Sequence, residues 1–354
     1  MRQKTLNIYD FGFSILQVET QSLCNMNCAF CCYPIREDKG LTLADEMVYG
    51  LIDTFRGAQG LEYLCLSQFN EPLMDHRIFD FIKYSMQKGI SIQIITNGTL
   101  FSSKQIIHKL INSNPWVVKV SLQTLNPTLF KNARKCDVFF DHYKLGIFEF
   151  LKSAVNSKMT IFVDIACNFH TPLKSLRSRI IGLEAGDPSV YNYLGELKND
   201  LKTFLKEFYS YVQNSSFFDE DKIDEWLRRV SRDYSNNPGF KINDNAFLKI
   251  KPFYYGRRLS EFFPLKNTSG CKNRILSVLA SGNVVPCCMA YGEILSLGNI
   301  KHETLEKILI RNKELLAQIK NGKNLPLHCA RCMGAPTKRA IPLKALKYSL
   351  RDIF

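Results

Sequence analysis

Three cysteines near the start of the chain, Cys24, Cys28 and Cys31, stand in a C-x3-C-x2-C arrangement. Thiolates are soft ligands, so cysteines at this density suit zinc or an iron–sulfur cluster. Zinc in a closed structural site takes four protein ligands, and a [4Fe–4S] cube has four irons to satisfy. Three cysteines therefore leave one iron of such a cube open to a small molecule. Cys32 lies outside the spacing and is assigned to packing or loop structure, with a role as a thiol near the site as the alternative.

A second group of four cysteines lies in the last quarter of the chain. Four thiolates close the coordination sphere of a [4Fe–4S] cluster or of a structural zinc, and both readings stay open at this point. The segment "GNVVPC" favours Cys287 as a ligand over its neighbour Cys288. The four cysteines are Cys271, Cys287, Cys329 and Cys332. The single cysteines Cys65, Cys136 and Cys167 are assigned to packing, as buried thiols usually are. Cys167 ends the fifth predicted strand, so donation of a hydrogen atom to a substrate radical stays open as its alternative role.

Composition indicates an ordinary globular protein. The N-terminal residues "MRQKTLNIYD" are polar and do not resemble a signal peptide, and no apolar run is long enough to span a membrane. We therefore expect a cytoplasmic protein, in which clustered cysteines are metal ligands more often than disulfides. The net charge of +14 favours anionic partners. The basic clusters are short and scattered, which disfavours nucleic acid, although a zinc-containing RNA-binding or RNA-modifying protein remains the alternative function.

The elements that would position these cysteines form repeated βα units. Short β-branched runs predict strands at 13–19, 63–67, 91–96, 117–123 and 160–166, with a sixth at 247–255. Helical spacing of apolar residues predicts helices at about 43–57, 76–88, 102–112 and 141–157, and a helical insertion at about 190–234. Strands that alternate with helices favour an α/β fold with a parallel sheet.

The composition changes after about residue 263. A hairpin at 276–288, turned by Ser281-Gly282-Asn283, is followed by a helix near 303–320 and by "HCARC". We expect a core domain at 10–262, a small α+β domain at 263–340 and a C-terminal tail at 341–354.

Polar residues stand where the predicted parallel strands end. Glu71 follows the second strand, Asn97 the third, and Ser121 and Gln123 close the fourth, while Cys24 follows the first. Barrel-type sheets place their active sites at the carboxyl ends of their strands, so these residues are expected to meet at one site.

The stretch "CNMNCAFC" is similar to the defining motif of the radical S-adenosylmethionine (SAM) enzymes. The resemblance implies a partial (β/α)6 TIM-like barrel whose [4Fe–4S] cluster binds Cys24, Cys28 and Cys31 and whose fourth iron is chelated by SAM. It implies that Glu71 receives the SAM amine, although Phe69-Asn70 replaces the glycine pair that usually precedes this acidic residue.

The same resemblance implies roles for the remaining candidate residues. Ser121 and Gln123 would lie near the methionyl carboxylate and ribose of SAM, Phe30 would lie against its adenine, and Asn97 belongs to a Thr-Asn-Gly turn that recurs in the family. The second cysteine group resembles the auxiliary-cluster domains called SPASM and twitch. No cysteine follows Cys332, so the twitch form with one [4Fe–4S] cluster fits better.

Together these resemblances imply an oxidoreductase. Reductive cleavage of SAM yields a 5′-deoxyadenosyl radical, which takes a hydrogen atom from the substrate, and the auxiliary cluster then oxidises the substrate radical. An electron donor such as flavodoxin or ferredoxin is expected. The substrate is a small polar metabolite or a peptide; the short segment before Cys24 disfavours the peptide. No catalytic acid or base is assigned, and Tyr254, Tyr255, Arg257 and Arg258 are candidates to face the substrate.

Overall fold

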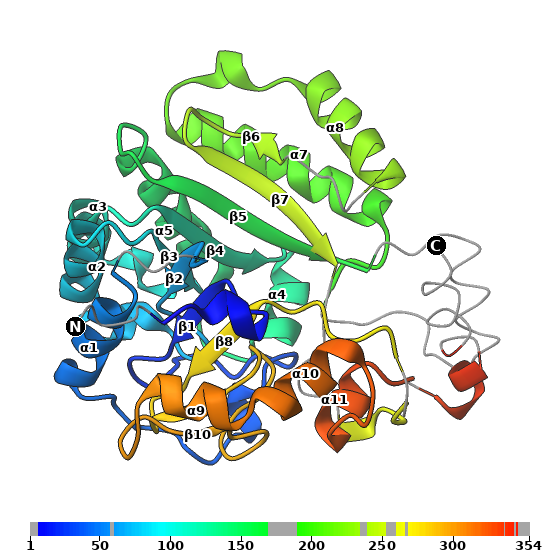
Figure 1. Ribbon diagram of the computed structural model, residues 1–354. Helices are drawn as coiled ribbons and strands as arrows, with labels where there is room; N and C mark the ends of the chain where they lie inside the picture. The colour runs from blue at the N-terminus through cyan, green and yellow to red at the C-terminus, as the bar shows by residue number, and fades with distance from the viewer. Residues whose placement is uncertain are drawn as a thin grey trace.

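The computed structural model describes residues 6–56, 60–168, 190–233, 239–252, 260–265, 268–335, 337–342 and 345. These residues are built around one ten-stranded sheet with the order β10-β9-β8-β1-β2-β3-β4-β5-β7-β6 (Figure 1). The tail beyond residue 345 and Tyr254, Tyr255, Arg257 and Arg258 lie outside the described residues.

The central strands of this sheet run parallel and follow one another in sequence from β1 to β5, as the βα pattern predicted. β7 continues the parallel run beside β5. The parallel strands are β1 (Ile15–Val18), β2 (Tyr63–Cys65), β3 (Ile92–Thr96), β4 (Val117–Gln123), β5 (Thr160–Cys167), β7 (Ala246–Pro252) and β8 (Ile275–Val278). The antiparallel strands at the edges are β6 (Phe240–Lys241), β9 (Asn283–Val285) and β10 (Gly298–Asn299). The fold is therefore an open α/β barrel of the TIM-like type, as expected.

Helices connect the strands and cover the sheet, with α7 and α8 over its β5–β7 end and α9 and α10 over its β8–β10 end (Figure 1). The α-helices are α1 (Asp45–Thr54), α2 (Ile78–Gln87), α3 (Lys104–Ser113), α4 (Pro127–Arg134), α5 (Phe140–Ser153), α7 (Leu194–Tyr211), α8 (Glu220–Arg232), α9 (Leu305–Arg311), α10 (Lys313–Asn321) and α11 (Leu327–Cys332). Short 3-10 helices are η1 (Ile8–Phe11), η2 (Tyr33–Ile35), η3 (Pro72–Met74), η4 (Thr99–Ser102), η5 (Ser215–Phe217) and η7 (Lys338–Ala340). The predicted insertion at 190–234 is helical, because Ile223, Trp226, Leu227 and Val230 of α8 form a buried stripe at helical spacing.

The C-terminal hairpin differs from the expectation in one respect. Its turn is confirmed: Gly282 has a φ of +89°, and a Cβ there would lie 2.5 Å from Asn299 Oδ1. Its first strand, however, pairs in parallel with β1, with Ile15 opposite Ile275. The hairpin therefore extends the barrel sheet and does not form a separate layer. The boundary at 263 stays a prediction.

Two further sequence predictions need correction. The helix expected near 303–320 is split at Asn312, whose side-chain amide donates hydrogen bonds to the carbonyls of Ile308 and Leu297, both at 2.8 Å. An additional helix, α4, follows β4 and was not predicted. Within the described chain, no helix combines the length and apolar character that crossing a bilayer requires.

Candidate active site

The loop that carries Cys24, Cys28 and Cys31 is held by a buried ion pair. Glu19, directly after β1, is fully buried, and its carboxylate accepts hydrogen bonds from Arg36 Nη2 at 2.9 Å and from the backbone N–H of Ala280 at 3.2 Å. Arg36 follows the cysteine loop, and Ala280 lies in the C-terminal hairpin. One carboxylate therefore fixes both the loop and the hairpin that leads to Cys287.

The three predicted cysteines lie within electrostatic reach of one another. Burial raises the pKa of Cys24 and of Cys31 to about 12, and the charge of Cys28 adds to both shifts. A thiolate in such a setting forms only beside a compensating positive charge, which a metal centre supplies. The loop is therefore suited to hold metal rather than a free nucleophile.

Arg134, the last residue of α4, lies at the centre of this site, and sequence reasoning missed it. The residue is only 2% exposed, its Nη1 donates to Cys28 Sγ at 3.4 Å, and its guanidinium carbon is 5.8 Å from the ring centroid of Phe30. Burial opposes its charge, but the Cys28 and Tyr143 side chains raise the pKa of Arg134. Its Nε and Nη2 find no hydrogen-bond partner among the described residues. These two donors point to an anion at the cysteine loop.

The chain contains a local signal for α4 that could have located Arg134. Asn126 caps the helix by accepting hydrogen bonds from the N–H groups of Thr128 and Leu129, and Pro127 occupies its first position. The cysteine loop docks on the end of this helix, because the N–H of Ala29 donates to the carbonyl of Ala133 at 2.8 Å.

Glu71 is brought next to Cys24, but its carboxylate is enclosed. It accepts hydrogen bonds from Thr96 Oγ1 at 2.7 Å and from the N–H groups of Asn97 and Leu73 at 2.6 and 3.1 Å, and the residue is only 1% exposed. Burial raises the pKa of Glu71 to about 7, and these hydrogen bonds oppose the rise. Glu71 therefore ties the end of β2 to the end of β3. Its expected contact with the SAM amine stays a prediction.

Asn97 contacts the cysteine loop directly. Its side-chain amide donates to Cys24 Sγ at 3.9 Å and to Asn25 Oδ1 at 2.8 Å. Its carbonyl oxygen accepts a hydrogen bond from the Tyr143 hydroxyl at 2.7 Å. The predicted Thr-Asn-Gly turn thus orients the first cysteine.

Ser121 and Gln123 share one face of β4. Gln123 Nε2 donates to Ser121 Oγ at 2.6 Å, and Gln123 has a φ of +69° where the pairing with β5 shifts by a bulge. A left-handed residue at a bulge re-aims its side chain, a device common beside active sites. Both side chains are half-buried. Their expected contacts with SAM, and that of Phe30 with adenine, stay predictions.

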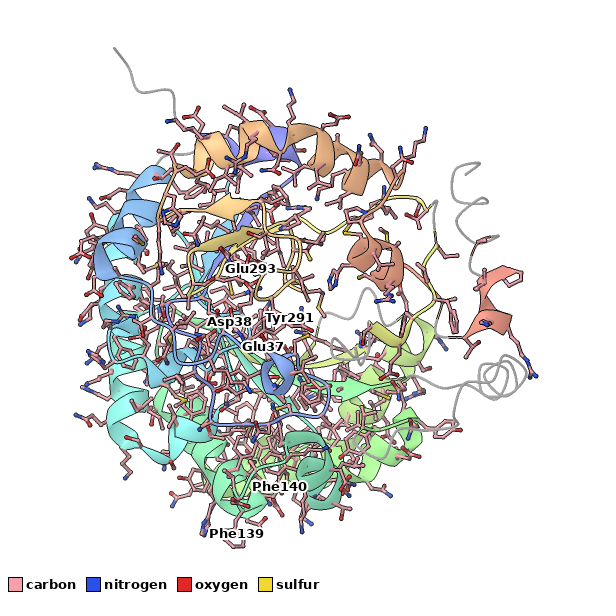
Figure 2. The ribbon with its side chains drawn as sticks, turned by 90° about the horizontal axis from the view of Figure 1, so that it is seen from below. Glu37, Asp38, Phe139, Phe140, Tyr291 and Glu293 are labelled. Atoms are coloured by element: carbon pink, nitrogen blue, oxygen red, sulfur yellow. The ribbon has the colours of Figure 1, made fainter. Side chains whose placement is uncertain are left out.

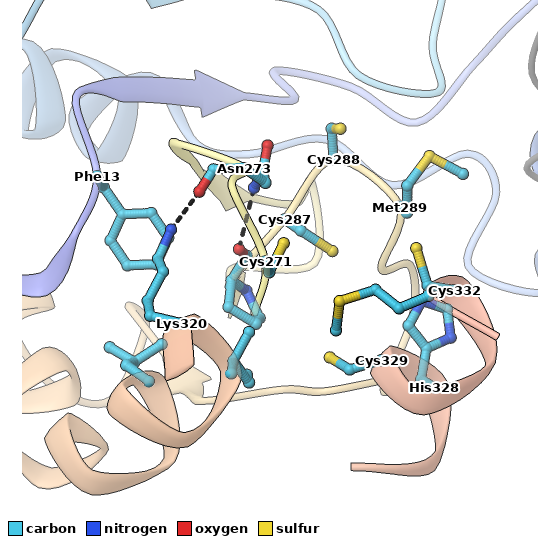
Figure 3. A pocket seen from close by; sticks show the side chains of 14 residues that line it. Phe13, Cys271, Asn273, Cys287, Cys288, Met289, Lys320, His328, Cys329 and Cys332 are labelled. Atoms are coloured by element: carbon cyan, nitrogen blue, oxygen red, sulfur yellow. Dashed lines mark hydrogen bonds between the residues drawn. The ribbon is translucent and has the colours of Figure 1, made fainter. Parts of the chain in front are cut away.

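The second cysteine group surrounds a cavity of about 90 Å³ (Figure 3). Burial raises the pKa of Cys329 to about 12, and the charges of Cys271 and Cys332 add to it; burial also raises the pKa of Cys287, with Cys329 and Cys332 contributing. The four predicted residues therefore lie together. His328 and Lys320 also line the cavity, and His328 Nε2 is buried without a partner in the described chain.

Cys287 and Cys288 both line this cavity; burial raises the pKa of both thiols, and the charge of Cys332 adds to both shifts. In Figure 3 the sulfur of Cys287 points toward Cys329 and Cys332, whereas that of Cys288 points to the opposite side. The choice of Cys287 over Cys288 as a ligand stays a prediction.

The donor sets fit the two expected clusters. In the part of the chain that the structure describes, no three Cys, His, Asp or Glu side chains converge tightly enough to hold one metal ion. A cube takes one thiolate at each of its irons, so its ligands need not meet at one point. The three cysteines beside the buried guanidinium therefore suit a cluster with one iron left for a small molecule. The four cysteines around the cavity suit a cluster in which every iron has a cysteine ligand.

Comparison with known proteins identifies the class. The model of the radical SAM superfamily matches residues 18–163, and that of an iron–sulfur cluster-binding domain, SPASM, matches residues 271–333. The chain belongs to the radical SAM superfamily and carries a C-terminal SPASM domain. Its cofactors are accordingly SAM, a [4Fe–4S] cluster and auxiliary iron–sulfur clusters. The two matches span both cysteine groups and describe iron–sulfur proteins, so they favour the radical SAM enzyme over the zinc-containing RNA-binding or RNA-modifying alternative.

Solved structures agree in fold. anSMEcpe with bound AdoMet is 17% identical, with 96% of this chain and 97% of that chain covered and a TM-score of 0.51. Streptococcus suis SuiB bound to the precursor peptide SuiA is 15% identical, with 85% of this chain and 66% of that chain covered and a TM-score of 0.51. No match to this chain was found among the curated proteins.

Arg134→Met is expected to impair the first site. The substitution keeps the apolar stem but removes the donor to Cys28 and the charge that faces the two other thiolates; a charge-assisted hydrogen bond is worth about 1.5–3 kcal/mol. SAM should bind at least tenfold more weakly, and iron at the first site should fall. Both are measured by equilibrium dialysis and iron analysis after anaerobic purification. Lys135→Met, which changes the exposed next residue, is the control; wild-type iron and SAM affinity in Arg134→Met would contradict the assignment.

Glu71→Gln is expected to change how stability depends on pH. The folded-state pKa of about 7 exceeds the ordinary value of 4.5. The buried carboxylate therefore lowers the free energy of unfolding by its full amount above pH 7, and this destabilisation disappears as the carboxyl group is protonated between pH 7 and pH 4.5. This group should stabilise the wild type by up to about 3 kcal/mol on going from pH 8 to pH 5. Denaturant unfolding of both proteins at these pH values measures the difference. If the free energies of unfolding of the wild type and of Glu71→Gln changed equally between pH 8 and pH 5, Glu71 would not titrate in this range.

Proposed function

We propose that the chain is a radical SAM oxidoreductase that removes a hydrogen atom and one further electron from its substrate. The family defines SAM cleavage at a cluster held by three cysteines; the net two-electron oxidation is the step that we add. Cys24, Cys28 and Cys31 would hold the first cluster, and Cys271, Cys287, Cys329 and Cys332 the second.

The observation that carries this proposal is a buried connection between the two cysteine groups. Cys32, Tyr33 and Phe69 form a buried cluster, and the residues that pack against it come from both regions: Cys24, Cys31, Met289 and Tyr291. The rings of Phe69 and Tyr291 lie 5.9 Å apart in an edge arrangement. Figure 2 shows Tyr291 in the same region as Glu37 and Asp38, which follow the cysteine loop. Met289 also lines the cavity of the second cysteine group, so packed side chains join the two groups, and such a packed path favours electron transfer between the two centres.

Bound at the first site, the cluster and SAM would supply the 5′-deoxyadenosyl radical, and the second cluster would accept one electron. The residues of the chain bind and orient these groups. Arg134 balances the thiolate charge, Asn97 orients Cys24, and Ser121 and Gln123 present polar atoms for the methionyl carboxylate and ribose. Phe30 lies beside Arg134, where an adenine ring could pack.

The electron balance is as follows. One electron from a donor such as flavodoxin or ferredoxin cleaves SAM to methionine and the radical, which takes a hydrogen atom and leaves as 5′-deoxyadenosine. The substrate radical then loses one electron and one proton. The substrate is oxidised by two electrons in all, and one SAM is consumed in each turnover.

The substrate is proposed to be a small polar metabolite or a peptide. SuiB is bound to a precursor peptide in its structure, so a related fold accommodates one. For this chain we also propose the boundaries 10–262 for the core, 263–340 for the auxiliary domain and 341–354 for the tail.

The experiment that tests this proposal does not require a named substrate. Reduced enzyme and SAM are incubated anaerobically with a small-molecule and peptide extract of the producing organism grown in deuterated medium. Mass spectrometry should find 5′-deoxyadenosine that carries deuterium, and the labelled fraction identifies the substrate. Cleavage of SAM without deuterium transfer from any fraction would contradict hydrogen abstraction from a cellular substrate.

A further inference from the structure

Charged side chains lie on the inner face of the sheet, where the roles proposed above do not use them. On β4, on β7 and in the first half of β5, buried residues alternate with partly exposed ones, whereas the second half of β5, which includes Asp164, is buried throughout. The buried set packs with the helices in the main core: Val118, Val120, Leu122, Ile161, Val163, Ile165, Leu248 and Ile250. Side chains alternate between the two faces of a strand, so the other set lies on the inner face: Lys119, Ser121, Gln123, Phe162, Asp164, Lys249 and Lys251.

Three lysines of this set surround one carboxylate; we call Lys119, Lys249 and Lys251 the lysine cluster. Lys251 forms an ion pair with Asp164, and Lys249 is directly opposite Asp164 in the pairing of β5 with β7. Lys249 Nζ lies 4.4 Å from the ring centroid of Phe162, and Lys119 is opposite Phe162 on β4. The strand pairing therefore gathers three cations around a single carboxylate.

The cations outnumber the carboxylates of this face, and Lys119 is left without a counter-ion. It makes no ion pair or side-chain hydrogen bond among the described residues. Burial lowers the pKa of Lys119, and the charge of Lys251 lowers it further, while Asp164 opposes the shift. A partly buried ammonium beside like charges is unfavourable unless an anion joins it.

After the Lys119 ammonium, the carboxylate oxygen Oδ1 of Asp164 is a second unsatisfied polar group on this face. Its side chain is 8% exposed and its Oδ2 faces Lys251, yet Oδ1 has no hydrogen-bond partner within the described chain. Buried carboxylate oxygens are rarely left without a donor. The side chain of Lys251 is 44% exposed, so this part of the inner face is open to an incoming molecule.

We propose that the lysine cluster binds an anionic group of the substrate, a carboxylate or a phosphate, and that Asp164 Oδ1 accepts a hydrogen bond from a hydroxyl or ammonium group of the same molecule. Lysine ammonium groups bind such anions as point charges, and three of them outweigh the repulsion from one carboxylate. The inference rests on the proposed function, because Ser121 and Gln123, expected to contact SAM, lie on the same face of β4 as Lys119. The substrate carbon would then be held between the lysine cluster and the SAM end of the sheet.

The test measures anion binding separately from catalysis. Isothermal titration calorimetry of the reconstituted, SAM-loaded enzyme uses inorganic phosphate and succinate in turn, at constant ionic strength set with chloride. Four variants are compared with wild type: Lys119→Met, Lys251→Met, Asp164→Asn and, as the control, Lys206→Met on the exposed side of α7. SAM cleavage and thermal unfolding are recorded on the same preparations.

Wild type should bind at least one of the two anions, and the one bound more tightly tells whether phosphate or carboxylate is the recognised group. Binding should weaken at least tenfold in Lys119→Met and Lys251→Met, strengthen in Asp164→Asn, and stay unchanged in Lys206→Met. Misfolding would weaken anion binding in every variant, so a gain in affinity in Asp164→Asn would show that the lysine variants lose the anion site and not the fold. Equal affinity in all variants, or no binding of either anion by wild type, overturns the lysine cluster as the substrate site. If the wild type bound the anion through the lysine cluster but did not cleave SAM, the proposed function would be refuted and the anion site would stand.

Discussion

Replacing Cys24, Cys28 and Cys31 together with alanine will reduce the formation of 5′-deoxyadenosine to the level without enzyme. These thiols lie within electrostatic reach of one another beside Arg134, and the three-cysteine set is what leaves one iron open for SAM. The second cysteine group lies around its own cavity, so its iron should remain. 5′-Deoxyadenosine by liquid chromatography, and iron and sulfide per chain, are measured on the same samples.

Cys32→Ala is the matched control for this experiment. Cys32 is adjacent to Cys31 and fully buried, but it stands outside the C-x3-C-x2-C spacing. The variant should keep its first-site iron and cleave SAM with a chemical reductant at the wild-type rate. Cleavage at the wild-type rate in the triple variant, or its loss in Cys32→Ala alone, would move the cluster to another set of ligands.

Cys329→Ala combined with Cys332→Ala will stop product formation while SAM cleavage continues. Both residues line the cavity of the second site, and Cys332 contributes to the raised pKa of Cys287 and of Cys329. Without the electron acceptor the substrate radical cannot lose its second electron. With the substrate found by deuterium transfer, labelled 5′-deoxyadenosine should still form, whereas the product that lacks a pair of hydrogen atoms should disappear.

Cys288→Ala provides the control at the second site. Cys288 also lines the cavity, but it lies outside the predicted ligand set and Figure 3 draws its sulfur on the other side of the chain from that of Cys287, so this variant should retain both the second cluster and the product. Full product yield from a double variant shown to lack the second cluster would overturn the electron-acceptor role. Zinc in place of iron at this site, in protein matured anaerobically, would do the same and leave the domain a structural part.

The strands and the helices between them were predictable because their signals are local. Alternation and β-branched runs located β1 to β5, and β4 was predicted with its observed limits, Val117–Gln123. The helix at Pro127–Arg134 was missed, although Asn126 and Pro127 provide its cap, because it is short and polar on average. The pairing of β8 with β1 could not be read from the sequence, since it joins residues about 260 positions apart.

The cysteines proposed as metal ligands come from their spacing, but their surroundings could not be predicted from the sequence. The cysteine spacing predicts ligands but not the positive charge that balances them. Arg134 reaches Cys28 because Ala29 of the cysteine loop hydrogen-bonds to the end of α4. The enclosure of Glu71 by Thr96 and Asn97 also depends on how two strand ends meet. The lysine cluster arises in the same way, from the pairing of β4, β5 and β7.

The most direct test of the central claim is the electron paramagnetic resonance spectrum of a variant in which Cys271, Cys287, Cys329 and Cys332 are all replaced, so that only the first cluster remains. We predict that about four irons per chain are retained and that SAM, added to the reduced protein, changes the spectrum, because SAM fills the iron that three cysteines leave open. A spectrum that SAM leaves unchanged, at a concentration that saturates binding, would contradict the account.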